Sequence, residues 1–126
     1  MKLVLDAGAL IALDRNDRAM WRRLKAAHLA GEIAVTHGGV VGQVWRSGGP
    51  RQALLALALA SVEVRALDES LGRAAGKLLV SAARSDVIDA ALVLLADDDD
   101  QIATSDPRDI GPLARAAGLH IELIPA

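Results

Sequence analysis

Short, continuously apolar segments alternate along this chain with longer segments of helical periodicity. Short apolar runs bounded by turn residues are typical of buried strands, whereas apolar residues at intervals of three and four are typical of helices. Strands that are separated by helices favour a parallel sheet covered on both faces, which is the doubly wound α/β class. We therefore predict five strands, at residues 3–5, 33–35, 62–64, 102–104 and 120–123.

Seven helical patterns accompany these strands. Gly31 and Gly118 stand where helix C-termini are expected, and Pro107 stands where a helix should begin. No repeat or interdomain linker is visible, so we expect a single domain over residues 1–126, long enough to bury an ordinary core. The predicted helices span residues 7–13, 18–30, 40–46, 51–60, 68–83, 86–96 and 107–117.

The chain contains no cysteine. This excludes disulfide frameworks, thiolate zinc sites and cysteine nucleophiles, and it agrees with a reducing compartment. The longest strictly apolar run, Ala53–Ala60, is far shorter than the ~18 residues of a membrane-spanning helix. Asp6 interrupts the apolar start of the chain too early for a signal peptide. We expect a cytoplasmic protein that does not associate with membranes.

Charge is distributed unevenly along the chain. The formal net charge of -2 argues against a generally basic nucleic-acid binder. Residues 15–51, however, carry seven cations and two acids, whereas residues 86–109 carry eight aspartates and one arginine. This layout suits an acidic metal site beside a basic rim that binds anions, and it equally suits two charged faces that meet partners or only water.

Two aspartates follow predicted strands. Asp6 ends the first strand and Asp106 follows the fourth. Ligands of open parallel sheets collect beyond the carboxyl ends of the strands, where the strand order reverses, so both residues are candidates for a site. The alternative is structural, because Asp6 and Asp106 each precede a predicted helix as an N-cap, and Asp109 suits the dipole of the second helix.

Asp89 is harder to explain structurally. If Ser85 caps the following helix, Asp86 is its first residue and Asp89 its fourth, too deep to act as a cap. The helix continues with apolar residues on all sides, which predicts burial, and a buried carboxylate is costly unless a cation compensates it. Asp86 shares a face with Asp89, but its exposed position in the first turn is explained by the helix dipole.

Several carboxylates without nearby histidine or cysteine favour a hard cation such as Mg²⁺ or Mn²⁺. Such ions serve metal-dependent nucleases by stabilising phosphoryl charge and activating water. If the acids crowd together, repulsion should raise the pKa of at least one of them. The remaining candidates have simpler explanations: we expect a solvated loop at Asp97–Asp100, and surface or strand-end positions for His28, His37 and His120.

Four segments of the chain resemble, in order and spacing, the motifs of PIN domains, specifically the small VapC-type toxins of type II toxin–antitoxin pairs. The segments are Leu3–Leu13, Val40–Arg46, Asp89–Leu92 and Thr104–Asp106. The family usually has Glu in the second motif, where this chain has Gln43. One negative charge is therefore missing from the implied metal site, and weaker metal binding is expected.

The resemblance implies a PIN-like three-layer fold, with a central five-stranded parallel sheet and helices on both faces. It also implies an endoribonuclease that depends on Mg²⁺ or Mn²⁺ and cleaves RNA. Arg46 and the basic segment Arg15–Lys25 are candidates to hold RNA phosphates, although solvated helix faces explain the segment equally well. The implied catalytic set is Asp6, Gln43, Asp89 and Asp106, and the implied metal ligands are Asp6, Asp89 and Asp106, with Asp86 as a further candidate.

Two protein partners are also implied. VapC-type toxins bind a cognate antitoxin and usually form homodimers, and the apolar segment Arg51–Ala60 is a reasonable interface. Trp21 and Trp45 have apolar neighbours, which favours packing over base stacking. The competing hypothesis is a binding module, a PIN domain that has lost catalysis through Gln43 and retains RNA or antitoxin binding.

Overall fold

The computed structural model describes residues 1–126 as a five-stranded, all-parallel sheet with seven α-helices. The strand order is β3-β2-β1-β4-β5. The α/β class predicted from the sequence is confirmed. The strands are β1 (Lys2–Leu5), β2 (Ile33–His37), β3 (Glu63–Arg65), β4 (Gln101–Thr104) and β5 (Glu122–Pro125).

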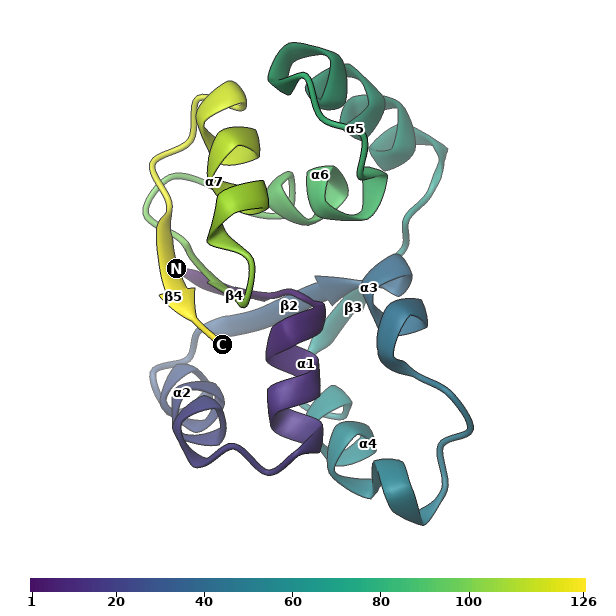
Figure 1. Cartoon of the computed structure of the whole chain (residues 1–126). Helices are drawn as coiled ribbons and strands as arrows, with labels where there is room; N and C mark the ends of the chain where they lie inside the picture. Colours follow the sequence, from purple (N-terminus) through teal and green to yellow (C-terminus); the bar gives the residue numbers. More distant parts are fainter.

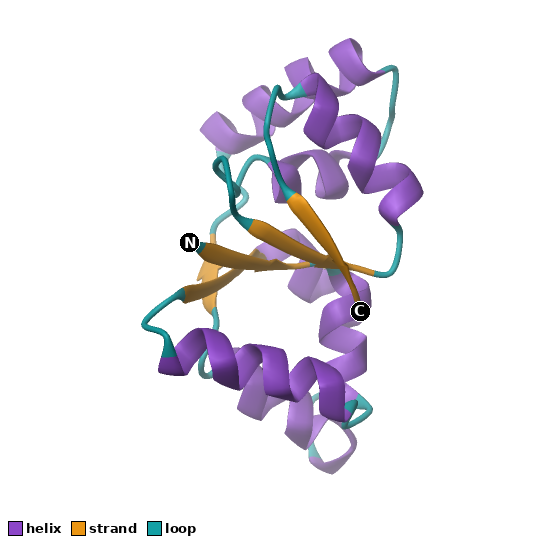
Figure 2. Ribbon diagram, turned by 90° about the vertical axis from the view of Figure 1, so that its left-hand side faces the viewer, coloured by secondary structure: helices purple, strands orange, loops and turns teal.

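The helices form a layer on each face of the sheet (Figures 1 and 2). Helices α1 (Ala7–Asp14), α2 (Arg18–Leu29) and α4 (Ala53–Leu59) cover one face. Helices α5 (Glu69–Ala82), α6 (Val87–Val93) and α7 (Pro107–Ala116) cover the other. Helix α3 (Gly38–Val44) follows β2 directly, and a 3-10 turn (Pro50–Gln52) precedes α4. None of the helices combines the length and apolar character that a membrane crossing requires.

The order in which strands are added to the sheet reverses at β1. It runs outward from β1 through β2 to β3, and then returns to place β4 on the other side of β1. Leu5 at the end of β1 pairs with Ala103 near the end of β4. The reversal therefore brings the residues that follow β1 and β4 to the same edge of the sheet, the place where α/β folds bind ligands.

Both faces of the central strands are buried, which explains their continuous apolar sequences. Val4 and Ile102 are fully buried in the middle of the sheet. Leu10 and Leu13 of α1 close one face, and Leu92 of α6 closes the other. The acids at the ends of these strands are therefore positioned by a well-packed core.

Several element boundaries differ from the predicted ones. Strand β5 spans Glu122–Pro125, two residues later than predicted, because it pairs with β4 from Gln101 onward. Helix α6 begins at Val87, since Asp86 rather than Ser85 is the N-cap. The prediction that Asp86 is the first helical residue was wrong. The segment predicted as one helix over residues 51–60 divides into the 3-10 turn and α4.

The apolar α4 and the two tryptophans are partly used inside the molecule. Leu55 and Ala58 of α4 are fully buried, whereas 62% of Leu57 is exposed. Trp21 packs against the core and donates its indole N–H to the Leu13 carbonyl at 3.0 Å. The Trp45 ring, 37% exposed, lies against Gly48. Packing within the chain thus explains the apolar character of Trp21 and of the buried side of α4, but not that of the exposed Leu57.

The aspartate run Asp97–Asp100 is not a simple solvated loop, and that expectation was wrong for Asp100. The Asp100 carboxylate is 3% exposed and accepts backbone N–H groups from Lys2 at 2.7 Å and Asp97 at 2.8 Å. The Lys2 ammonium lies 3.0 Å from the same carboxylate. Asp98 accepts the His120 N–H at 2.8 Å. The run therefore holds the start of β1 through Lys2 and the segment before β5 through His120.

Asp100→Ala is expected to destabilise the protein by about 3 kcal/mol, because it leaves two backbone N–H groups without their acceptor and removes one of the two carboxylates beside the Lys2 ammonium. Asp97→Ala is the control, because its 83% exposed carboxylate should contribute less than ~1 kcal/mol. Chemical denaturation at pH 7 measures both. Equal losses would contradict this account.

The Asp100 contribution should also depend on pH. Burial acts to raise the pKa of Asp100, but the N–H groups of Asp97 and Lys2 and the Lys2 ammonium lower it on balance. The contact with Asp97 raises the pKa of Lys2 against the effect of burial. The stabilisation should therefore disappear as the pH falls below the ordinary 3.8 of Asp100 or rises above the ordinary 10.5 of Lys2.

Candidate active site

Asp6 is held rigidly at the junction of β1 and α1. Its Oδ1 accepts the Ala9 N–H at 2.8 Å, so the predicted N-cap role is confirmed. Its Oδ2 accepts the Ser105 N–H at 3.2 Å, from the turn after β4. The residue is only 7% exposed. One carboxylate thus fixes the relative positions of the two strand ends.

Asp106 stands at the N-cap position of α7, but its side chain makes no capping hydrogen bond. The structural explanation for this carboxylate was therefore wrong. The Asp106 N–H is instead donated to the Thr104 hydroxyl at 2.8 Å, which holds the turn after β4. A hydrogen-bonding contact with the Asp106 carboxyl, followed by repulsion from its charge, raises the pKa of Asp109 one turn along the helix. Two acids consequently meet at the start of α7.

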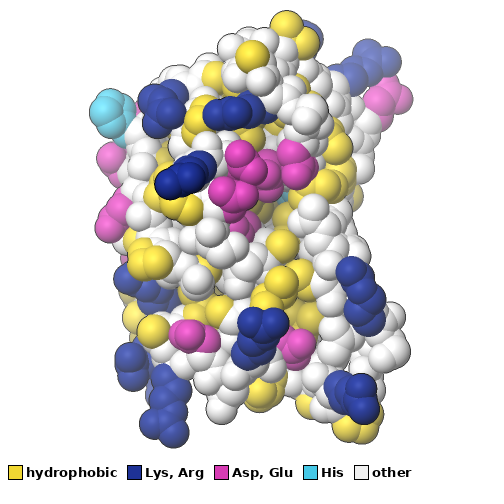
Figure 3. All heavy atoms as spheres, viewed as in Figure 1, with side chains coloured by type: hydrophobic (Ala, Val, Ile, Leu, Met, Phe, Trp, Pro, Cys, Tyr) yellow, Lys and Arg dark blue, Asp and Glu magenta, His cyan; other side chains and the backbone are white.

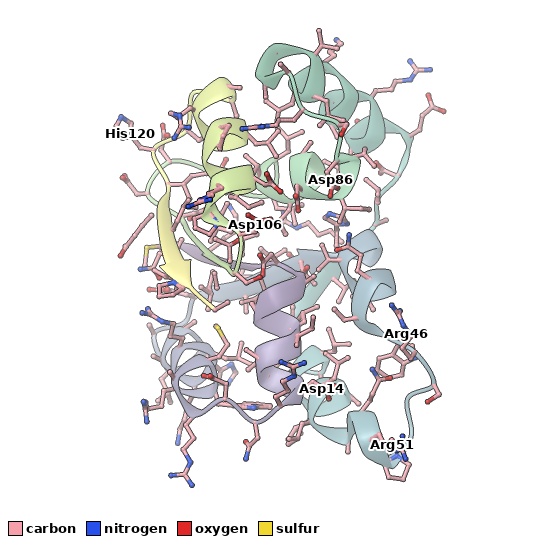
Figure 4. All side chains as sticks on the ribbon, in the orientation of Figure 1. Asp14, Arg46, Arg51, Asp86, Asp106 and His120 are labelled. Carbon is pink, nitrogen blue, oxygen red and sulfur yellow. The ribbon has the colours of Figure 1, made fainter.

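Asp86 and Asp89 face this pair from α6. The Asp86 carboxylate caps α6 by accepting the N–H groups of Ile88 at 2.9 Å and Asp89 at 3.2 Å. Asp89 is the third helical residue, half-buried, and is followed by the fully buried Ala90 and Ala91. Figure 4 shows Asp86 and Asp106 on neighbouring elements, and Figure 3 shows acidic side chains gathered in one group near the middle of this face.

The pKa of Asp89 is raised to about 6. Burial is the main cause, and repulsion from Asp86, Asp109, Asp6 and Asp106 adds to it, in that order. The expectation that crowding raises the pKa of at least one acid is confirmed in direction. Asp89 therefore stands within the electrostatic reach of all four other acids, which we call the acidic cluster: Asp6, Asp86, Asp89, Asp106 and Asp109.

A pocket of about 380 Å³ opens over part of this cluster. It is lined by Asp86, Asp89 and Asp109 together with Ala83, Arg84, Ser85 and Leu113. No three acidic or histidine side chains stand close enough together to form a ready ligand set for one ion. Asp86, Asp106 and Asp109 are exposed to solvent, whereas Asp89 is half-buried.

Gln43 and Arg46 are not brought into this pocket. Gln43 is exposed in the last turn of α3 and does not line the pocket. The Arg46 guanidinium donates to the carbonyls of Gly42, Gln43 and Trp45 at 2.8–3.2 Å, which satisfies the C-terminus of α3. Figure 4 shows Arg46 well away from Asp86 and Asp106. The structure thus gives Arg46 a helix-capping role.

Two charged residues of the pocket, Asp109 and Arg84, were not predicted as site residues. Asp109 was explained by the dipole of α7, although its spacing of three from Asp106 places both on one helix face. Arg84 lies just outside the predicted acidic segment and carried no signal in the sequence, because only the turn between α5 and α6 brings it to the pocket.

Gly8 allows the two strand ends to come together. A Cβ at this position would overlap the Ser105 hydroxyl and would lie 2.5 Å from the Ser105 Cβ. The Ser105 hydroxyl fills the space beside Gly8. The absence of a side chain at Gly8 therefore sets the position of the turn that carries Asp106.

Gly8→Ala should displace this turn and cost about 1–3 kcal/mol of stability through overpacking. Gly76→Ala is the matched control, because Gly76 lies within α5 with nothing near its Cβ position, and it should gain up to ~1 kcal/mol from helix propensity. Thermal unfolding measures both variants. If Gly8→Ala also stabilises, the Gly8–Ser105 contact does not constrain the turn.

His37 connects α3 to α6 through its two ring nitrogens. It is fully buried at the end of β2, as the strand-end expectation allows. One ring nitrogen accepts the Gly39 N–H at 3.1 Å, and the other lies 2.9 Å from the Ile88 carbonyl, to which it donates. Burial lowers the pKa of His37. A neutral His37 thus connects the start of α3 to the turn of α6 that carries Asp89.

Comparisons with known proteins bear on the fold. No protein-family model matches the sequence, and no curated protein is significantly similar to it. The structure is similar to a chain in the crystal structure of VapBC2 from Rickettsia felis bound to a DNA fragment from their promoter, with a TM-score of 0.72 and 13% sequence identity. The match covers 98% of this chain and 99% of that one.

The fold is therefore VapC-like. The PIN-like, five-stranded parallel architecture predicted from the sequence is confirmed by this likeness and by the strand order.

Proposed function

We propose that this protein is a PIN-domain endoribonuclease, dependent on Mg²⁺ or Mn²⁺, and the toxin of a type II toxin–antitoxin pair. The observation that carries the proposal is Asp89, whose carboxylate stands half-buried among four other acids at the carboxyl end of a parallel sheet. Such crowding costs stability unless a cation binds there, so the arrangement is better explained by function than by folding.

The chemistry of the acidic cluster fits a hard divalent cation. Every acid offers only oxygen ligands, and the only nearby histidine, His37, uses both ring nitrogens elsewhere. We propose that Asp6, Asp89 and Asp106 hold the ion and that Asp86 and Asp109 add negative charge around it. When bound, Mg²⁺ or Mn²⁺ supplies charge stabilisation at a phosphoryl group and activates a water molecule.

The protein's own groups contribute orientation and proton exchange. Asp6 is immobilised by two backbone N–H groups, so it presents a fixed carboxylate. Asp89 exchanges its proton near pH 6, so ion binding below that pH should release a proton from it. The Thr104 hydroxyl, through the Asp106 N–H, keeps Asp106 at the edge of the sheet.

The toxin role rests on two independent likenesses. The sequence resembles VapC-type toxins in four segments, and the structural neighbour is a VapBC2 complex bound to promoter DNA. By analogy with that complex, we propose that an antitoxin protein binds this chain. A homodimer also remains part of the proposal, with the exposed side of α4 at Leu57 as one candidate surface.

Incubation of the purified, antitoxin-free protein with a mixture of structured and single-stranded RNAs tests the nuclease. We expect cleavage with Mn²⁺ or Mg²⁺ and none with EDTA. Gln43 does not line the pocket, so Gln43→Glu tests the resemblance directly: if the second motif belongs to the ion site, the added charge should tighten Mn²⁺ binding in calorimetry and raise the rate. Ala56→Glu is a control that adds the same charge at an exposed position of α4, on the other face of the sheet.

A negative result has a definite meaning. If the wild type and Gln43→Glu both leave every RNA intact with Mn²⁺, the nuclease proposal fails. Retained RNA or antitoxin binding would then identify the protein as a binding module on this fold.

A further inference from the structure

Arg84 occupies a distinctive place at the rim of the acidic pocket. It follows Ala83, which ends α5 in the left-handed conformation with φ 53° and ψ 47°. This conformation is unfavourable for a residue with a Cβ, and such outliers concentrate at functional sites. The Arg84 N–H is donated to the Leu79 carbonyl at 3.0 Å, which fixes the turn. The turn directs the chain so that Arg84 and Asp89 line the same pocket.

The Arg84 guanidinium is close to acids but forms an ion pair with none of them. Its charge reaches Asp109, where it acts to lower the pKa against the raising effect of Asp106. The four ion pairs of the molecule involve only Lys2, Arg65 and Arg73 as cations. By contrast, the Arg46 guanidinium is fully engaged with backbone carbonyls. Arg84 therefore keeps its donors free beside the cluster.

We infer that Arg84 binds a phosphate of the RNA substrate next to the acidic cluster. This inference rests on the proposed nuclease function and adds a substrate-binding residue to it. An exposed guanidinium offers a planar pair of N–H donors that matches two phosphate oxygens, and it offsets the repulsion between the RNA backbone and five carboxylates. The pocket, about 380 Å³, is lined by both charges and so accepts an anion and a cation together.

Arg15, another exposed arginine near the strand ends, suits this role less well. It lines a separate pocket with Gly8, Ser105 and Asp17, and none of the carboxylates of the acidic cluster lines that pocket. A phosphate held by Arg15 would therefore lie on the far side of the Gly8–Ser105 contact from Asp89 and Asp109. Arg84 is the cation that shares a pocket with these two acids.

Steady-state cleavage of a fluorescent single-stranded oligoribonucleotide with Mn²⁺, over a series of KCl concentrations, tests the inference. Arg84→Gln should raise KM about tenfold with little change in kcat, and should reduce the slope of log KM against log salt by roughly 0.7. Arg84→Lys should recover part of the affinity, because it keeps the charge but not the paired donors. Arg73→Gln is the matched control, because its exposed pair with Glu69 lies elsewhere on α5, and it should leave KM and the salt slope unchanged.

The outcomes separate this inference from the nuclease proposal. If the wild type cleaves and Arg84→Gln matches Arg73→Gln in KM and salt slope, the inference is overturned and the nuclease proposal stands. If the wild type does not cleave, fluorescence anisotropy of the same oligonucleotide replaces kinetics. Weaker binding by Arg84→Gln than by Arg73→Gln then supports phosphate binding without catalysis, whereas equal binding, or no binding by any variant, overturns it.

Discussion

Asp89→Asn is expected to make the metal-free protein more stable at pH 7 while reducing the proposed metal-dependent ribonuclease activity at least ~100-fold. The substitution removes a half-buried charge that four neighbouring acids repel. The raised pKa corresponds to roughly 3 kcal/mol for a fully buried group, and because the side chain is half-exposed we expect about 1–2 kcal/mol. Thermal unfolding should therefore shift upward by about 5 °C.

The sign of this effect depends on pH. The folded state holds the Asp89 proton up to about pH 6, whereas an unfolded chain loses it near the ordinary 3.8. The folded state thus binds more protons between these values, so stability falls as the pH rises through this window, and the penalty is complete above it. The stabilisation by Asp89→Asn should grow from near zero at pH 4 to its full value above about pH 6.

Divalent ions provide a second readout of the same variant. Millimolar Mn²⁺ should raise the unfolding temperature of the wild type, because an ion that binds only the folded state stabilises it, and should not raise that of Asp89→Asn. Asp99→Asn is the control, since Asp99 is exposed in the loop before β4, and it should keep the response to Mn²⁺. An unchanged response in Asp89→Asn would exclude Asp89 as an ion ligand.

Asp6→Asn should lose activity by at least ~100-fold as well, but with the opposite effect on stability. An amide keeps one acceptor oxygen, so its NH₂ group would face either the Ala9 or the Ser105 N–H, at a cost of about 1–2 kcal/mol. Because both variants should lose activity while their stabilities change in opposite directions, together they separate the effect on catalysis from the effect on folding. Thermal unfolding and RNA cleavage measured in parallel decide the matter, and full activity in either variant would contradict the assigned ligand set.

The sequence predicted the layered fold because its strongest signals are local. Runs such as Leu3–Leu5 and Ile102–Thr104 are apolar because both faces of the sheet are buried, so they indicate strands before any pairing is known. The edge strands carry less of this signal. In β5, Glu122 is exposed and the strand extends to Pro125, so its limits are set by pairing with β4 rather than by its own sequence.

The candidate site was only partly predictable for a similar reason. The positions of Asp6 and Asp106 follow from the ends of their strands, and that of Asp89 from its buried helix. Arg84, in contrast, reaches the pocket because Ala83 before it adopts the left-handed conformation. An alanine does not favour that conformation, so the sequence does not predict it. Arg46 was expected near RNA, but its donors were within reach of the unsatisfied carbonyls of its own helix.

The hydrogen bond from the Ser105 N–H to Asp6 joins residues separated by 99 positions in the chain. Strand β1 likewise pairs with a strand that lies far along the chain, as in the pair of Leu5 with Ala103 of β4. Contacts between distant residues form late, because the long loop must close before they contribute. During synthesis, the edge of the sheet that carries the acidic cluster therefore stays open until β4 and the start of α7 have emerged from the ribosome. The acidic cluster can be complete only after Asp106 and Asp109 have been synthesised and β4 has paired with β1.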